Sequence, residues 1–571
     1  MTLRRLRGLA CLLGAVFGFS AFFVWSEWSY GYLQNYRTFA PSPGGLALRL
    51  HLLLFILPAT VLLAVGVALL GPAPGRLLAW FDAMGRARPA RGWPVALALV
   101  ALGLTAGIRS SVLDFSAITD DEYVYQFQAR LLGSGRLYAD SPPPAVRAFF
   151  DNQFIVNNGR WFGCYFLGHP IVLALAGTVG LDQWVGPIAS ALTLLLTVAI
   201  ARRIGGERVA ILTGILLVLS PFFLFLGATQ LSQPTSALML SLFWYAALRV
   251  EATPRAVRWW ALGAAALSFG VLSRPQTTVF LSLPFLARLL FLALRGRLRP
   301  GVTPPAVAAV ILLAGATVFL SINHALTGSP WRTGYHAYMA QGPEWLFPFG
   351  LFYSVREISH NLGHLNFWLF GWPVSLAFLP FFRRTEEAWT LAAIPALTVL
   401  WYGAVAVPTV PTVGPVYYGE AIGPLVILSA SGIAQAIAGV RARLGDSLWA
   451  SALSTWPWTS AFAALLAFIP VQVSSLRLST EIVKAPYELA AREKLDHAIV
   501  FVHSIPSLLK EPGSWVHHHR NNSPDLSDPV LFVRDLGEKN GELMRFLPNR
   551  KAYVMGMRGR DLILIPASPV S

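Results

Sequence analysis

Charged residues are scarce in this sequence of 571 residues: they make up 13% of the chain, while 55% of the residues are hydrophobic. A soluble domain carries about 25% charged residues, so this composition excludes an ordinary soluble protein and indicates a membrane protein. Lysine is absent before Lys484. The last stretch of the chain therefore differs in composition, and we expect a separate, water-exposed domain there.

Cysteine is also rare, with Cys11 in the first apolar run and Cys164 in a loop. We expect no disulfide between them, and two cysteines do not define a redox compartment. The net charge of +16 does not indicate a nucleic-acid partner. The arginines cluster between apolar runs, as the positive-inside rule expects of cytoplasmic loops.

Repeated apolar runs predict a polytopic helical membrane protein, because about 20 apolar residues form a helix that crosses the hydrocarbon core. We expect about thirteen spans, at residues 8–25, 46–70, 93–112, 184–203, 207–226, 232–250, 257–272, 276–294, 302–324, 366–382, 388–407, 418–440 and 456–475. The arginine distribution places the N-terminus in the cytoplasm and the C-terminus outside. The basic start followed by an apolar run predicts an uncleaved first span. The short run HPIVLALAGTVG, residues 169–180, predicts a helix at the outer interface.

The predicted spans divide the chain into three parts. Residues 1–92 would form an N-terminal pair of transmembrane helices. Residues 93–475 would form a membrane core with long outer loops at 114–183 and 325–366. The strand-like pieces AIVFVH, PVLFVRD, KAYVMG and LILIP, with the helix-like KNGELMRFL, predict a small extracytoplasmic α/β domain over residues 476–571.

Three adjacent acids, Asp120, Asp121 and Glu122, follow the third span. Thr119 and Glu122 have capping-box spacing, and acids in a first helical turn are favoured by roughly 0.3–1 kcal/mol each, so a well-capped interfacial helix would explain them. A capping box needs only one acid, however, and adjacent carboxylates repel each other near a low-dielectric membrane. A carboxylate kept ionised by a helix N-terminus suits a general base or a metal ligand.

The same region carries a family resemblance. An apolar span followed by Asp-Glu-x-x-Tyr (Asp121, Glu122 and Tyr125) in the first large outer loop resembles the GT-C superfamily of membrane glycosyltransferases. In particular it is similar to glycosyltransferase family 39, which includes protein O-mannosyltransferases and lipid A aminoarabinose transferases. GRWFGCYFLGHPIVLA resembles the family's Tyr-x-x-x-x-Pro segment, and VLSRPQ and NHALTGSPWRTGYH resemble later outer loops in the same order. The resemblance covers most of residues 93–475, although Asp120 here precedes the Asp-Glu pair.

The resemblance implies a polyprenyl-phosphate sugar as donor and inverting transfer at the extracytoplasmic face, to a glycan, lipid or protein acceptor. An acceptor hydroxyl must lose a proton as it attacks the anomeric carbon, so a carboxylate base is needed. Asp121 is the first choice for this base and Asp120 the second. Glu122 is the third acid of the predicted catalytic cluster.

Cations must face the phosphate that leaves. Arg274 in SRPQ and Arg332 in GSPWRTGYH are the candidates, whereas Arg109, near the end of the third span, is interpreted as a snorkelling anchor. The predicted substrate-binding residues are, besides the two candidate arginines, Tyr125, His169, Tyr335 and His336.

The outer loops also contain ligand types that suit a divalent metal ion. The first set is Glu122, Asp151 and His169, and His336 and Glu344 are of suitable type as well. Their spacing matches no metal motif, so a divalent metal ion is retained only as an alternative cofactor.

A transporter or flippase of a lipid-linked glycan is the alternative from another class, and a polysaccharide ligase or polymerase is an intermediate alternative. Transporters place charges near the bilayer midplane, often with repeat symmetry. Here the spans are nearly free of acids and no repeat is visible, which favours the enzyme. The arginine- and alanine-rich composition indicates a bacterial inner (plasma) membrane protein whose partners are the bilayer, the donor and the acceptor.

Overall fold

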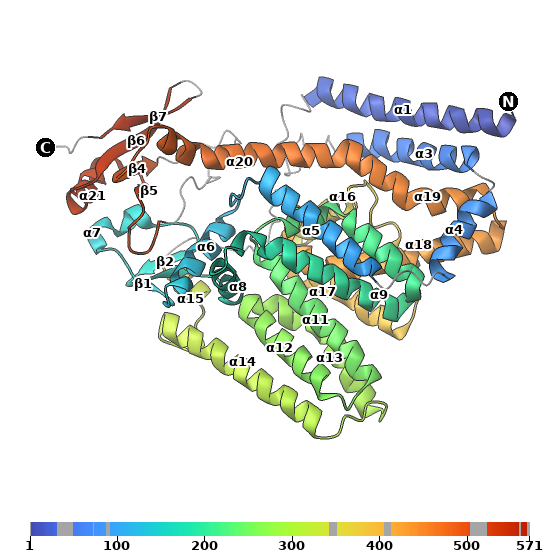
Figure 1. Ribbon diagram of the computed structural model, residues 1–571, viewed down its shortest axis with the longest axis horizontal. Helices are drawn as coiled ribbons and strands as arrows, with labels where there is room; N and C mark the ends of the chain where they lie inside the picture. Colours follow the sequence, from blue (N-terminus) through green and yellow to red (C-terminus); the bar gives the residue numbers. More distant parts are fainter. Residues whose placement is uncertain are drawn as a thin grey trace.

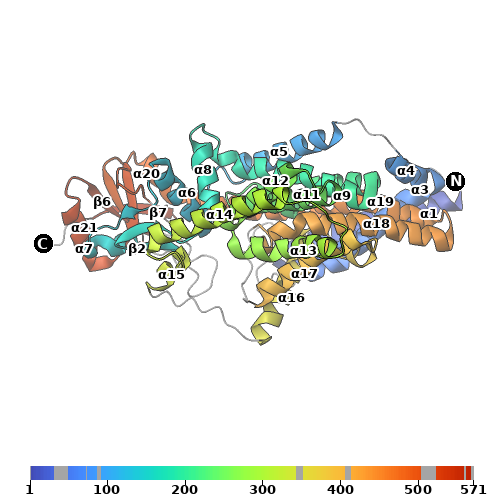
Figure 2. The ribbon, with the colours of Figure 1, turned by 90° about the horizontal axis from the view of Figure 1, so that it is seen from below.

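The computed structural model describes residues 2–30, 49–71, 74–86, 92–341, 351–404, 413–502, 522–558 and 561–567. Helices form most of it, and two small sheets lie together at one end (Figure 1). We call this end, where residues 114–183 lie, the loop end; the N-terminus lies at the other, the far end. Seen from below, the sheets share the loop end with the short helices of the outer loops (Figure 2).

The N-terminal helices lie along one side of the molecule (Figure 1). α1 (Leu3–Tyr30) packs along α3 (Leu57–Leu70), which continues a short π-helical turn. Glycine allows this close contact, since a Cβ on Gly18 would lie 2.9 Å from the Cβ of Ala59. α4 (Pro74–Arg86) follows at the far end and contacts the central bundle.

The central bundle begins with α5 and runs to α14. Its helices are α5 (Trp93–Ser111), α9 (Val185–Val218), α10 (Pro221–Gly227), α11 (Ser232–Ala252), α12 (Val257–Ser273), α13 (Pro275–Leu294) and α14 (Thr303–Thr327). α9 is interrupted at Gly206, whose φ of 76° lies in the left-handed region that glycine tolerates. A Cβ on Gly214 would lie 3.2 Å from Val198. α9 therefore folds back on itself as two antiparallel segments, which agrees with the separate predicted spans at 184–203 and 207–226.

The second half of the chain completes the bundle. Its elements are α16 (Leu351–Trp368), α17 (Glu386–Ala404), the 3-10 helix η5 (Val416–Ala421), α18 (Ile422–Leu444), α19 (Leu448–Ala463) and α20 (Ile469–Arg492). α18 is largely buried against α9 and α17. α19 and α20 form one helical run of 45 residues, Leu448–Arg492. This run reaches from the bundle to the C-terminal sheet (Figure 1).

Eight helical segments in the described part of the chain are long and apolar enough to cross a membrane. The multi-pass helical class is therefore confirmed, while the larger number of spans expected from the sequence is not. The span predicted at 366–382 is wrong, because α16 ends at Trp368 and turns follow. Gly371 adopts a φ of 63°, and the Asn366 amide closes the turn by donating to the Pro373 carbonyl at 2.6 Å.

The first outer loop folds around a three-stranded antiparallel sheet of order β1-β3-β2. Its elements are α6 (Asp120–Gly133), β1 (Ala139–Asp140), α7 (Pro144–Arg147), β2 (Ile155–Asn158), β3 (Arg160–Gly163) and α8 (Gly168–Gly177). α8 is too short to span a membrane, as the sequence predicts. From the second outer loop, α15 (Gly334–Met339) packs on β2.

The C-terminal residues form a four-stranded sheet of order β5-β4-β6-β7 with an antiparallel edge at β7. Its elements are β4 (Ala498–Val502), β5 (Val530–Arg534), α21 (Asn540–Phe546), β6 (Lys551–Arg558) and β7 (Asp561–Pro566). Phe501 meets Phe149 of the first outer loop with ring centroids 6.0 Å apart, and Phe532 meets Tyr487 of α20 at 4.6 Å. The sheet thus shares a hydrophobic core with the loop. Residue 476, where the sequence predicts the domain to begin, lies inside α20.

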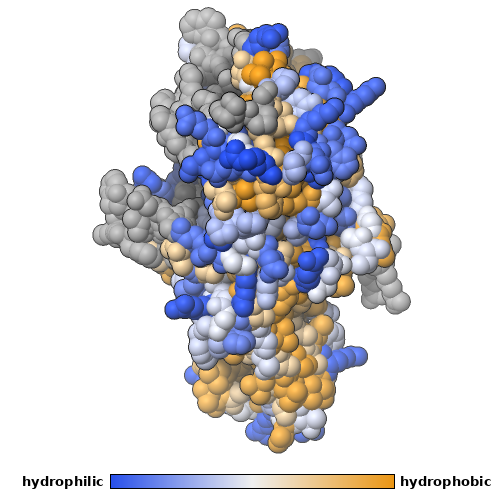
Figure 3. Space-filling model, turned by 90° about the vertical axis from the view of Figure 1, so that its left-hand side faces the viewer, coloured by the Kyte–Doolittle hydropathy of each residue, from blue (hydrophilic) through white to orange (hydrophobic). Residues whose placement is uncertain are grey.

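Viewed from the loop end, the surface is mostly hydrophilic above, and apolar side chains gather below (Figure 3). The lower part is where α14 lies in Figure 1. Its exposed side chains include Val310, Leu312, Leu313 and Val318. A continuous apolar surface of this kind suits contact with lipid.

Candidate active site at the start of helix α6

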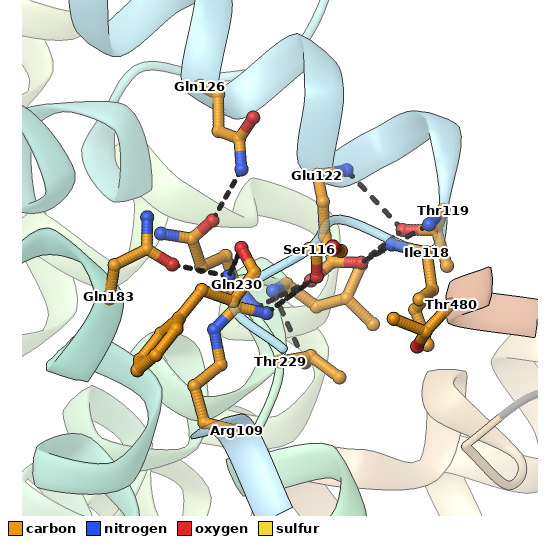
Figure 4. A network of polar contacts seen from close by, with 12 residues as sticks. Arg109, Ser116, Ile118, Thr119, Glu122, Gln126, Gln183, Thr229, Gln230 and Thr480 are labelled. Atoms are coloured by element: carbon orange, nitrogen blue, oxygen red, sulfur yellow. Dashed lines mark hydrogen bonds and ion pairs between the residues drawn. The ribbon is translucent and has the colours of Figure 1, made fainter. Parts of the chain in front are cut away.

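α6 begins with the capping box that the sequence predicts (Figure 4). The Glu122 backbone N–H donates to Thr119 Oγ1 at 3.4 Å, and Glu122 Oε2 accepts from the Thr119 backbone N–H at 3.2 Å. The prediction of a capped helix is therefore confirmed. The cap uses Glu122 alone, so Asp120 and Asp121 need a different explanation.

The Glu122 carboxylate has a structural role. Its side chain is fully buried, and Oε2 also accepts from the Ile118 backbone N–H at 2.9 Å. Oε1 accepts from the Gln230 backbone N–H at 2.8 Å and lies 4.0 Å from Arg109 Nη1. With both oxygens engaged, Glu122 holds the start of α6 against the α10–α11 connection. This geometry gives no support to its predicted catalytic and metal-binding roles.

Arg109 is not a snorkelling anchor, because its side chain is completely buried. Its guanidinium donates to the Ser116 carbonyl at 2.8 Å, the Phe115 carbonyl at 3.0 Å and the Gln183 side-chain oxygen at 2.5 Å. A snorkelling arginine would reach outward to the interface. Arg109 instead ties the end of α5 to the segment that leads into α6 (Figure 4).

Asp121 lies among aromatic residues from three separate segments. Its carboxylate accepts a hydrogen bond from the Tyr165 hydroxyl, and Asp121 is half-buried. The Tyr165 ring lies 5.1 Å from the ring of Tyr125 on α6 and 5.5 Å from that of Tyr335 on α15, and Phe154 lies at 5.2 Å. Residues of both outer loops therefore meet at this carboxylate.

Arg274 lies between α12 and α13 and faces the same site. Its Nε lies 2.7 Å from Glu420 Oε1, and its Nη1 and Nη2 donate to Ser232 Oγ at 3.2 Å and to the Tyr402 hydroxyl at 3.0 Å. Ser232 Oγ also accepts from the Tyr125 hydroxyl at 2.9 Å. The sequence prediction that Arg274 and Tyr125 share a site with Asp121 agrees with this chain of contacts.

The two aspartates differ in the charge that their surroundings favour. Burial and the neighbouring Asp121 charge raise the pKa of Asp120 to about 8. Burial also raises the pKa of Asp121, but the Tyr165 hydrogen bond and the positive charge of Arg274 act in the opposite direction. The pair holds one negative charge more easily than two. We therefore place that charge on Asp121 and the shared proton on Asp120.

His169 serves as a link between α8 and α11. Its Nε2 lies 2.8 Å from the Gln230 carbonyl and therefore donates, which leaves Nδ1 to accept from Thr235 Oγ1 at 2.9 Å. Burial lowers the pKa of His169 to about 4, so the ring is neutral. Both ring nitrogens are occupied, and His169 touches the site only through its ring, whose centroid lies 5.0 Å from that of Tyr125.

The remaining predicted residues lie around α15. Tyr335 joins the aromatic cluster and is 37% exposed, so its ring can meet a ligand. His336 Nδ1 accepts from Thr333 Oγ1 at 2.9 Å, and His336 is the N3 residue that pairs with the N-cap Thr333 in the capping box of α15. Arg332 is exposed just before this helix. Of the two candidate arginines, Arg274 is held in the site by hydrogen bonds to Ser232 and Tyr402 and by an ion pair with Glu420.

The three predicted metal ligands do not come together. Asp151 accepts from Asn157 Nδ2 at 3.0 Å and lies in the field of Arg534 on the C-terminal sheet. Glu122 and His169 are occupied as described above. Nowhere in the described ranges do three His, Cys, Asp or Glu side chains converge as metal ligands would. Glu344 lies outside the described residues.

A cavity of about 510 Å³ lies on the other face of α6, between α6 and α8. Tyr123, Gln126 and Arg130 of α6 line it, together with Leu173 of α8, whereas Asp121 does not. Residues 123, 126 and 130 follow helical spacing, so they share a face that turns away from Asp121. The cavity is therefore separated from the carboxylate by the helix itself.

Sequence reasoning missed three side chains of the site: Tyr165, Tyr402 and Glu420. Tyr165 is the tyrosine of the Tyr-x-x-x-x-Pro segment quoted above, so the resemblance contained it. Glu420 is an acid at the edge of an apolar span, and an ionisable residue in such a place is a candidate for function. Tyr402 carries no local signal, because only the fold brings it to Arg274.

Comparisons with known proteins agree with this architecture. Residues 171–324 match the model of the dolichyl-phosphate-mannose-protein mannosyltransferase family. The fold matches the crystal structure of ArnT from Cupriavidus metallidurans in the apo state, with a TM-score of 0.53 and 14% identity over 81% of this chain and 92% of that chain. The ArnT structure bound to undecaprenyl phosphate matches with a TM-score of 0.50 and 15% identity, over 84% and 99% of the two chains.

No curated protein matches the chain in sequence. At the identities found, the two ArnT structures establish the fold and nothing more, and the family model covers the part of the chain from α8 to α14. The resemblance to the GT-C membrane glycosyltransferases is thus confirmed, and the chain has their fold.

Proposed function

We propose that this protein transfers a sugar from a polyprenyl-phosphate donor to an acceptor hydroxyl, with inversion, at its loop end. The observation that carries the proposal is the Asp121 carboxylate, which is held by Tyr165 and lies in the field of Arg274. The match to a mannosyltransferase family supports glycosyl transfer. The ArnT structure bound to undecaprenyl phosphate supports a lipid-linked phosphate donor.

The chemistry assigns one task to each group. Asp121 removes the proton of the acceptor hydroxyl while its oxygen attacks the anomeric carbon of the sugar. The bond between that carbon and the phosphate oxygen breaks on the opposite face, so the configuration inverts. The polyprenyl phosphate leaves with the bonding electrons, and Arg274 stabilises the negative charge that develops on it.

The neighbours of these two residues have supporting roles. Tyr165 donates to Asp121, which favours the ionised form that a base requires. Glu420 lies 2.7 Å from Arg274 Nε and holds the guanidinium in place. The exposed Tyr335 ring, next to Tyr165, offers a flat surface on which a sugar can stack.

The loop end would face the outside of a bacterial inner membrane. This sidedness is supported by the arginine-rich segments at the far end, such as the tip that joins α9's two halves, where Arg202 and Arg208 lie. The N-terminus and the C-terminal sheet lie at opposite ends of the bundle, as this topology requires (Figure 1).

The test is donor turnover by the full-length protein in detergent. Release of polyprenyl phosphate from a mixture of undecaprenyl-phosphate sugars would be followed with and without an envelope extract as acceptor source. We expect acceptor-dependent release by the wild type and a loss of about 100-fold or more in Asp121→Asn, since a general base contributes this much. Asp120→Asn is the matched control, because Asp120 is already protonated near neutral pH.

Two results would overturn the proposal. If Asp121→Asn releases polyprenyl phosphate as fast as the wild type, Asp121 is not the base. If the wild type releases none from any donor but moves lipid-linked sugar across reconstituted vesicles, the protein is a flippase.

A further inference from the structure

A second site of interest lies at the far end, away from Asp121. α11 begins at Ser232 beside Arg274 and ends at Ala252, so the connections from α11 to α12 and from α13 to α14 both lie at that end. Between these connections is an open hollow of about 400 Å³. Arg255 lines it from the first connection, and Arg297 and Arg299 line it from the second.

The positive charge of this hollow is only partly balanced. Arg255 and Arg299 are exposed. Arg297 Nη1 lies 3.9 Å from Glu386, but both side chains are largely exposed, and such a pair is worth little. The acids nearby, including Glu386, gather around Arg288, to which Glu251 is bound at 2.8 Å. Arg299 Nε donates to the Gly296 carbonyl at 3.1 Å. An anion entering the hollow would therefore meet the two Nη groups of Arg299 and the guanidinium of Arg255.

The start of α12 adds donors of a second kind. Ala256 lines the hollow and is the N-cap of α12, a helix of 17 residues that has no side-chain cap. The first N–H groups of a helix have no partner within the helix, and the helix dipole favours an anion at this point. Phosphate groups are bound in this way at the N-termini of many helices.

The hollow also lies where phospholipid headgroups would be. Trp259 and Trp260 follow within the first turn of α12, and Trp260 Nε1 donates to the Pro254 carbonyl at 2.9 Å. Tryptophan is enriched at the level of the headgroups. Leu294 and Val302, which flank the α13–α14 connection, are both strongly exposed, so lipid chains have an apolar surface beside the charges.

We propose that this hollow binds the phosphate group of an anionic phospholipid, with Arg255, Arg299 and the start of α12 as its ligands. Basic pockets between transmembrane helices bind lipid headgroups by the same chemistry. Free inorganic phosphate presents the same oxygens without the chains, and the experiment separates the two sources. The proposal is independent of the sugar transfer at the loop end.

The test is lipid retention by the full-length protein, measured by native mass spectrometry in detergent with added phosphatidylglycerol or phosphatidylcholine. The double variant Arg255→Gln/Arg299→Gln removes two charges that line the hollow. The control Arg258→Gln/Arg295→Gln removes two charges beside the same connections, from the first turn of α12 and the end of α13, where the guanidinium groups stack on Trp259 and Phe291 instead. Both double variants remove two positive charges from this end of the molecule. A defect in folding or membrane insertion caused by lost charge would therefore affect them alike.

We expect the wild type and the control to retain phosphatidylglycerol over phosphatidylcholine, and the hollow double variant to lose about tenfold or more in affinity for it. Equal losses in the two doubles, or no loss in either, would overturn the site. In a second arm inorganic phosphate competes at millimolar concentration. Displacement of the lipid by phosphate alone identifies a free-phosphate site, and persistence of the lipid identifies a phospholipid site.

Discussion

Two buried arginine–glutamate pairs lie within the loop end, and they are built differently. In the first, Arg109 and Glu122 are both without exposed surface, and their charged atoms are 4.0 Å apart. In the second, Arg274 lies 2.7 Å from Glu420, and the arginine side chain keeps 16% of its surface exposed. Both pairs connect segments that are far apart in the sequence.

The partners of the two pairs explain what each pair does. Glu122 binds mainly backbone N–H groups, and Arg109 binds two backbone carbonyls, so the first pair fixes the course of the chain. Arg274 binds the hydroxyl groups of Ser232 and Tyr402, which can rotate when a ligand arrives. The first pair therefore fixes the backbone around the site, whereas the second lies among hydroxyl groups that can reorient.

The largest effect is expected from breaking the first pair. Glu122→Gln removes the negative charge opposite Arg109 and leaves that arginine buried without its counter-charge, which should cost about 3–5 kcal/mol of stability. The measurement is thermal unfolding of the purified protein in detergent, with Asp121→Asn as the control that keeps the pair. A variant that unfolds at the wild-type temperature would show that this pair does not hold the fold.

One substitution made in both pairs would sharpen the comparison. Arg274→Lys keeps the charge opposite Glu420 but loses the planar fork, so we expect turnover to fall about 10- to 100-fold with little change in the unfolding temperature. Arg109→Lys loses hydrogen bonds to buried carbonyls and should cost about 1–3 kcal/mol of stability while the folded fraction keeps its turnover. The assays are polyprenyl phosphate release and thermal unfolding. If the two variants lost turnover and stability to the same extent, the two pairs would not differ in role.

A further effect concerns Asp120 and its pH dependence. The folded state raises the pKa of Asp120 from 3.8 to about 8, so the folded protein binds this proton more tightly than the unfolded chain. Its contribution to stability is therefore fully present below about pH 4 and is lost as the pH rises to about 8. Asp120→Asn should unfold a few degrees higher than the wild type at pH 8, with a smaller difference at pH 4. Parallel unfolding curves across this range would contradict the assignment.

Local features of the fold could be predicted from the sequence, because their causes are local. The capping box at Thr119 and Glu122 follows from spacing alone, and so do the apolar helices and the shortness of α8. The prediction of a span at 366–382 was wrong because hydropathy does not detect turns. Here Gly371 and the Asn366 side chain produce a turn.

The candidate site could be predicted only where its residues carry a local signal. Asp121 and Arg274 lie at the ends of helices whose positions can be predicted from the sequence. The capping role of Glu122 was predicted, but its contact with the Gln230 backbone N–H could not be foreseen, since Gln230 is more than a hundred residues away. The same holds for Glu420, whose significance depends on its contact with Arg274 across the bundle.

The helical run of Leu448–Arg492 is fastened to the segment that leads into α6. Thr480 donates to the Val112 carbonyl at 3.3 Å, and Lys484 forms an ion pair with Asp114. Beyond these contacts the same run continues to the C-terminal sheet. One helical run therefore contacts both the C-terminal sheet and the segment that leads into α6, so a single element sets the position of the sheet relative to the start of the candidate site.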